Sequence, residues 1–106
     1  MKNKEYSLKF TPKAFKDLDE IYGYIANKLF APETAENLMA KIETSIMRLK
    51  AFPYFCSFVL VEPLKNRGYR KLVVDNYIVF YLVNEQKYQV VIMRILYGAS
   101  SYQNIL

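Results

Sequence analysis

The spacing of the apolar residues changes twice along the chain, and this constrains the fold more than any other feature of the sequence. Over residues 5–10 apolar and polar side chains alternate, which predicts a half-buried strand. Between residues 11 and 50 the apolar side chains recur at steps of three and four, the spacing of an amphipathic helix. Runs rich in Tyr, Val and Ile follow over residues 69–97 and are typical of strands. We therefore predict an α+β fold in which helices separate an N-terminal strand from a later group of strands.

Two helices are expected between residues 11 and 53. Thr11 is a favourable N-cap residue, and Pro12 suits the first helical position. The helical spacing is interrupted at Ala31-Pro32, resumes, and ends before Phe52-Pro53, because proline removes a backbone donor and clashes with the preceding turn. So short an interruption predicts an antiparallel helical hairpin.

A three-stranded antiparallel meander is expected over residues 69–97. Its strands span residues 69–74, 77–83 and 88–97, with turns at Asp75-Asn76 and at 84–87. Both faces of the middle strand are apolar, and we expect Ile78, Phe80 and Leu82 to meet the helices. The opposite face is then left for a partner, and it consists of Tyr77, Val79, Tyr81 and Val83.

The remaining segments are less regular. Residues 54–68 have no clear period and contain Pro63 and Gly68, so a loop is expected there. After Gly98, Ser100 or Ser101 is expected to cap a short C-terminal helix that runs to Leu106.

The residue types that are present restrict the chemistry. The chain has 106 residues, no histidine and one cysteine, Cys56. We expect a single domain, 1–106, without a disulfide, a Cys-based zinc site or a His general base. Any catalysis has to use Asp, Glu, Lys, Arg or Tyr, and no cofactor or metal ion is expected. No segment approaches the roughly 20 apolar residues of a membrane span, so a cytoplasmic protein is expected.

Positive charge is concentrated in the second half of the chain. Residues 1–62 contain nine Lys or Arg and eight Asp or Glu, whereas residues 63–106 contain six and two. The formal net charge of +5 therefore indicates an acidic partner that meets the second half.

The order of elements, together with particular residues, resembles the RelE/ParE superfamily of toxins from bacterial type II toxin–antitoxin modules. The resemblance covers nearly the whole chain, and its wording is closest to the ParE-like, plasmid-stabilisation branch. The segments that carry it are Asp17 to Ile25, Ile42 to Leu49 with Phe52-Pro53, Gly68 to Leu72, Asn76 to Tyr81 and Met93 to Gly98.

The resemblance implies a toxin that a small antitoxin neutralises by wrapping its helices and sheet. Operator DNA would be contacted only through the antitoxin. ParE-like members inhibit DNA gyrase, and RelE-like members cut mRNA on the ribosome, so the resemblance leaves either target open. The fold does not distinguish these two targets, so the evidence has to come from individual residues.

An RNA-cleaving site would need a base near the 2′-hydroxyl and cations around the phosphate. The resemblance gives Glu62 as the base, Arg70 and Arg94 as the phosphate ligands, and Tyr97 or Tyr102 as the stacking group. For Arg70, a structural role is the alternative to binding phosphate. Arg94 lies in an apolar strand, so it needs either an open site or a carboxylate partner, for which Glu62 and Asp75 are candidates.

Other residues are candidates for binding a target or an antitoxin. Lys65, Arg67 and Lys71, with Tyr102, are expected to contact nucleic acid or the target, although charges of this kind also protect an edge strand from aggregation. An antitoxin helix or added strand is expected on the face of Tyr77, Val79 and Tyr81 or in the helical grooves.

Departures from the RNase pattern favour a function by binding. The segment from Leu96 to Tyr102 lacks the basic–aromatic pair of RNase members, and Val73 and Ile78 supply no cation. We therefore expect a ParE-like inhibitor of DNA gyrase. The alternatives are a ribosome-dependent mRNA endonuclease and a degenerate, non-toxic module that only binds its antitoxin.

Overall fold

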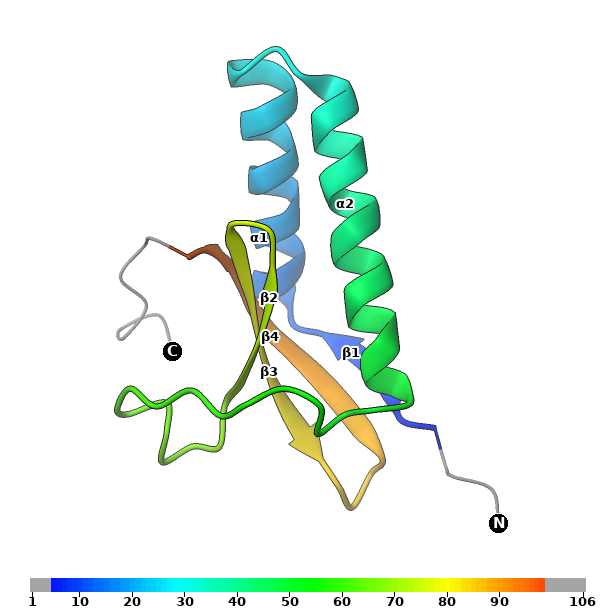
Figure 1. Ribbon diagram of the computed structural model, residues 1–106, viewed down its shortest axis with the longest axis vertical. Coiled ribbons are helices and arrows are strands. Elements are labelled where there is room, and N and C mark those ends of the chain that lie inside the picture. Colours follow the sequence, from blue (N-terminus) through cyan, green and yellow to red (C-terminus); the bar gives the residue numbers. More distant parts are fainter. Residues whose placement is uncertain (1–4, 99–106) are drawn as a thin grey trace.

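The computed structural model describes residues 5–98, and in it a helical hairpin packs on one face of a four-stranded sheet (Figure 1). The predicted α+β class is confirmed. The predicted C-terminal helix, with Ser100 and Ser101, lies outside the described residues. In chain order the elements are β1 (Ser7–Phe10), α1 (Pro12–Gly23), α2 (Pro32–Met47), β2 (Arg70–Val74), β3 (Tyr77–Asn84) and β4 (Gln89–Tyr97).

The helical hairpin begins and turns where the sequence predicts. The Thr11 hydroxyl accepts the backbone N–H of Ala14 at 3.1 Å, which satisfies one of the free donors at the start of α1. A π-helical turn, Tyr24–Lys28, extends α1, and α2 starts at Pro32. The buried side chains of α2 form one stripe, consisting of Ala35, Leu38, Ile42 and Ile46. None of the described helices is long and apolar enough to cross a membrane.

The strand order of the sheet is β1-β4-β3-β2. Strands β2, β3 and β4 form the predicted antiparallel meander, and β1 pairs with β4 in parallel. The pairing of β1 extends along β4 only as far as Phe10 opposite Ile92. Beyond that point the chain turns into α1, and the Thr11 hydroxyl donates to the carbonyl oxygen of Met93 at 2.9 Å. The free edge of β4 is therefore brought beside α1.

The two faces of β3 are opposite to those predicted. Val79 and Tyr81 are fully buried in the core cluster that includes the helices, whereas Phe80 belongs to a second cluster on the other side of the sheet. That second cluster is closed by the loop after α2, through Val59 and Leu64. The prediction was wrong because this loop covers the sheet as well, so both faces of β3 are apolar and their composition could not orient the strand.

Candidate functional site

Arg94 of β4 and Asp17 of α1 form a two-pronged ion pair. The Arg94 Nε donates to Asp17 Oδ2 at 2.7 Å, and Nη2 donates to Oδ1 at 2.9 Å. The same Oδ2 accepts the backbone N–H of Ile95 at 2.9 Å. The side chains of Arg94 and Asp17 are only 17% and 6% exposed. Asp17 therefore fastens α1 to the part of β4 that β1 does not reach.

This ion pair determines the electrostatics at Arg94. The hydrogen bond from Arg94 to Asp17 raises the pKa of the guanidinium, although burial acts in the opposite direction. Because both Asp17 oxygens accept from Arg94, a phosphate at Arg94 would have to compete with a buried carboxylate. The pair suits a structural role better than an open anion site.

The two predicted partners of Arg94 were wrong. Asp75 pairs with Lys41 at 3.2 Å, and Glu62 is exposed and bonds to no other described residue. Asp17 was missed, although the sequence contains a signal for it. It follows Ala14 by three residues, on the buried side of α1, where a carboxylate requires a partner.

Arg70 also has binding partners, and it lies on β2, the edge strand at the opposite end of the sheet from β1. Its Nη1 donates to the carbonyl oxygen of Cys56 at 2.6 Å. The guanidinium carbon lies 4.0 Å from the centroid of the Phe58 ring and 5.1 Å from that of Tyr54. Arg70 thus fastens the loop after α2 to the edge strand of the sheet.

Two tyrosines fasten the same loop. The Tyr81 hydroxyl donates to the carbonyl oxygen of Pro53 at 3.0 Å, and burial raises the pKa of this phenol. The Tyr54 hydroxyl donates to Glu85 Oε1 at 2.7 Å, and this hydrogen bond raises the pKa of Tyr54. The loop is therefore held at several points rather than packed only by its apolar side chains.

The cations predicted to meet a target lie in and beside this loop. Lys65 and Arg67 are exposed in successive turns over residues 61–68, and Lys71 is half-buried on β2. No cluster of three or more potential metal ligands occurs between residues 5 and 98. The residues proposed for RNA cleavage do not form one site. Glu62 is exposed, whereas Arg70 and Arg94 are hydrogen-bonded to other groups of the protein.

The tyrosines predicted for stacking and for antitoxin binding have different positions. Tyr97, at the end of β4, is half exposed and meets Tyr77 edge-to-face at 5.8 Å. Tyr102 lies outside the described residues. Val79 and Tyr81 have no exposed surface, so the open face expected there is absent from the described structure.

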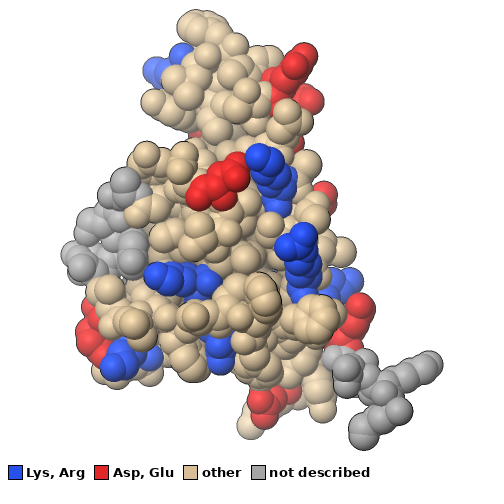
Figure 2. Space-filling model, viewed as in Figure 1, with Lys and Arg blue, Asp and Glu red and all other residues tan. Residues whose placement is uncertain are grey.

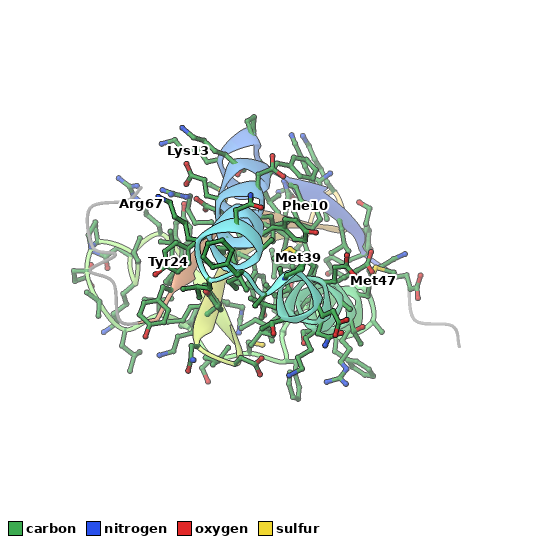
Figure 3. All side chains as sticks on the ribbon, turned by 90° about the horizontal axis from the view of Figure 1, so that it is seen from above. Phe10, Lys13, Tyr24, Met39, Met47 and Arg67 are labelled. Carbon is green, nitrogen blue, oxygen red and sulfur yellow. The ribbon has the colours of Figure 1, made fainter. Side chains whose placement is uncertain are left out.

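An apolar groove occurs instead beside the helices. It has a volume of about 510 Å³ and lies between β1, α1 and α2. Figure 3 shows Met39 and Met47 of α2 on the side of the hairpin that faces β1, which ends in Phe10. Phe15 and Met47 at the groove are about half exposed, and Glu43 is its one charged lining residue. The open apolar surface is therefore the helical groove and not the face of the sheet.

Comparisons with known proteins agree with this architecture. The family described as "ParE toxin of type II toxin-antitoxin system, parDE" matches residues 8–102. The chromosomal ParDE toxin–antitoxin system from P. aeruginosa contains a chain that is 28% identical, with a TM-score of 0.71, over 90% of this chain and 98% of that one. Among curated protein sequences, none matches significantly.

More distant structures share the fold. A chain of the toxin–antitoxin complex RelBE2 from Mycobacterium tuberculosis is 20% identical, with a TM-score of 0.62, and covers 88% of this chain and 98% of its own. The isolated E. coli RelE toxin is 15% identical, with a TM-score of 0.60, over 91% of this chain and 87% of that one.

Proposed function

The chain belongs to the ParE toxin family of type II toxin–antitoxin systems, and from that premise we propose that it inhibits DNA gyrase by binding and does not cut RNA. The observation that carries this proposal is the engagement of both candidate phosphate ligands. Arg94 is paired with the carboxylate of Asp17, and Arg70 donates to Cys56 and stacks on Phe58.

Cleavage of RNA would require these groups to act together. Both arginines would have to leave their present contacts and meet at one phosphate with Glu62 as the base. For Arg94 this leaves the buried carboxylate of Asp17 without a cation, which is strongly unfavourable. Inhibition by binding requires neither step, and the 28% identity to a ParDE chain supports the same choice.

The antitoxin is proposed to occupy the groove between β1, α1 and α2. Its lining is apolar and includes Met39 and Met47, whose flexible side chains adapt to the apolar face of a helix. Glu43 offers a partner for one basic residue of that helix. The helical grooves were expected from the sequence beside the face of Tyr77, Val79 and Tyr81, and only the groove is kept in this proposal.

Contact with gyrase is proposed to use Lys65, Arg67 and Lys71, together with Tyr102. The test is ATP-dependent supercoiling of a relaxed plasmid by purified gyrase, titrated with the full chain. Wild type is expected to stop supercoiling, and a variant with all three cations changed to Gln to need at least about tenfold more protein, because each rim charge contributes modestly.

The matched control changes Lys13, Lys16 and Lys28 to Gln, which removes the same charge from exposed positions on and beside α1. It is expected to inhibit as wild type does. Full supercoiling in the presence of excess wild-type chain would refute gyrase as the target. Equal loss of inhibition in both variants would refute the assignment of the three cations.

A further inference from the structure

The net charge of the chain is confined to one segment. Residues 48–71 contain six Lys or Arg and one acid, Glu62, so this segment has a net charge of +5, equal to that of the whole chain. The other residues contain nine cations and nine acids. In Figure 2 several Lys and Arg side chains lie over the lower half of the molecule, where the segment runs in Figure 1, and within that half Asp and Glu lie at the edges of the view.

Exposed aromatic rings are concentrated in the same segment. Phe52, Tyr54, Phe55 and Phe58 are 65%, 46%, 78% and 47% exposed, within seven residues. Single exposed rings are ordinary on a protein surface, but four beside a cluster of cations are not. They give the segment apolar faces as well as positive charge.

Part of this aromatic surface is rigid. The guanidinium of Arg70 lies over the ring of Phe58 and over that of Tyr54, at 4.0 and 5.1 Å from their centroids. Arg70 is fixed by its hydrogen bond to Cys56, and Tyr54 by its hydrogen bond to Glu85. We call this arrangement of Tyr54, Arg70 and Phe58 the aromatic platform. A ligand that stacks on it pays little entropy to order the rings.

The backbone brings the cations to the platform. Ser57 accepts the backbone N–H of Lys71 at 3.2 Å, and Val59 donates to Tyr69 at 2.8 Å, so residues 57–59 run beside 69–71. Phe58 and Arg70 are directly paired in this short ladder. The turns of residues 61–68, which contain Lys65 and Arg67, close its end.

We propose that residues 48–71 form a binding site for single-stranded nucleic acid. Bases would stack on Phe55 and the aromatic platform, and phosphates would lie at Lys65, Arg67 and Lys71. Such sites combine cations that lie along the nucleic-acid backbone with aromatic rings on which the bases stack. An acidic protein would need only the cations, and a duplex keeps its base faces inside the stack. The inference does not depend on the target that the toxin inhibits.

The test is fluorescence polarisation of the full chain with labelled oligothymidylate and oligouridylate of about 12 nucleotides, and with a duplex of the same length. Both single strands are expected to bind at least tenfold more tightly than the duplex. Phe55→Ala, whose ring is the most exposed of the four, is expected to weaken binding by roughly tenfold. Changing Lys65, Arg67 and Lys71 to Gln should lower the salt slope by about two.

Two variants control for surface changes elsewhere. Phe30→Ala removes a ring that is 87% exposed at the hairpin, and Lys13, Lys16 and Lys28 changed to Gln remove equal charge. Both are expected to bind as wild type does. Either preference would support the proposal. Tighter binding of the thymidylate would identify DNA as the natural ligand, and tighter binding of the uridylate would identify RNA.

Three results would overturn the proposal. They are equal affinity for the duplex and the single strands, unchanged binding by Phe55→Ala, and binding of an oligoglutamate peptide in the absence of any oligonucleotide binding. The last of these would point to an acidic protein. Since Phe55 makes no ring contact with another described residue, Phe55→Ala tests stacking without removing a contact of the aromatic platform.

Discussion

Asp17 is the residue that determines what Arg94 can do. Its carboxylate accepts two hydrogen bonds from the guanidinium and one from the backbone of Ile95, so it is satisfied only while Arg94 stays in place. A buried charge that loses its partner costs far more than the pair contributes. The sequence could show that Arg94 needs a carboxylate or an open site, but choosing between them, and among the carboxylates, requires the tertiary position of α1 against β4.

We expect Arg94→Gln to lower the free energy of unfolding by about 3 kcal/mol, because it leaves the Asp17 carboxylate buried without a cation. Urea denaturation measures this. The control is Lys41→Gln, which breaks the exposed pair with Asp75 and should change stability by no more than about 0.5 kcal/mol. Wild-type stability of Arg94→Gln together with loss of toxicity would instead place Arg94 in an active site.

Tyr81 gives a prediction about alkaline pH. Burial raises its pKa in the folded state above the ordinary value of 10.0. As the pH rises, Tyr81 therefore ionises in the unfolded state first. Its contribution to the free energy of unfolding is constant below about pH 10 and falls as the pH rises above that value. We expect Tyr81→Phe to cost about 1 kcal/mol at neutral pH, for the lost bond to Pro53, and to make the alkaline fall shallower. Denaturation at several pH values checks this, and an unchanged alkaline slope would contradict it.

At the level of elements, the helical hairpin and the meander follow from local patterns. Periodicity, an N-cap and two prolines place α1 and α2, and two short turns place β2, β3 and β4. The orientation of β3 does not follow from them, because it depends on the loop of residues 51–69, which has no period of its own. For this reason, of the two antitoxin surfaces expected from the sequence, the face of β3 is closed and the groove beside α1 and α2 is open.

The groove leads to a prediction about the antitoxin. Phe15→Asp combined with Met47→Asp places charges at two half-exposed positions of its lining. We expect the affinity for the cognate antitoxin to fall at least about 30-fold while toxicity persists, since truncating anchors of this kind costs 2 kcal/mol or more. Calorimetry with the purified antitoxin and growth on co-expression measure the two effects.

The control for the groove is Phe30→Asp, a charge at an exposed ring of the hairpin loop that the groove does not include. It should leave antitoxin binding intact. Normal rescue of the Phe15 and Met47 variant by the antitoxin would show that the antitoxin binds elsewhere.

At the level of the whole molecule, the hairpin covers one face of the sheet, and the basic loop closes the other face at the end away from the hairpin tip (Figure 1). The parallel pairing of β1 with β4 joins residues about 80 positions apart, and no local pattern predicts it. Two surfaces result, an apolar groove and an aromatic and basic segment, while Asp17 closes the edge of β4. Both surfaces are suited to binding, and neither brings Glu62, Arg70 and Arg94 together.

We propose that this toxin acts without cutting RNA. The most direct measurement maps mRNA 5′ ends by primer extension in a reconstituted translation system, using a preparation that has first been shown to inhibit gyrase or to stop growth. We predict intact mRNA, with and without ribosomes. Cuts that appear only on ribosomes, and that vanish in Glu62→Gln, would contradict the claim and would make Glu62 a catalytic base.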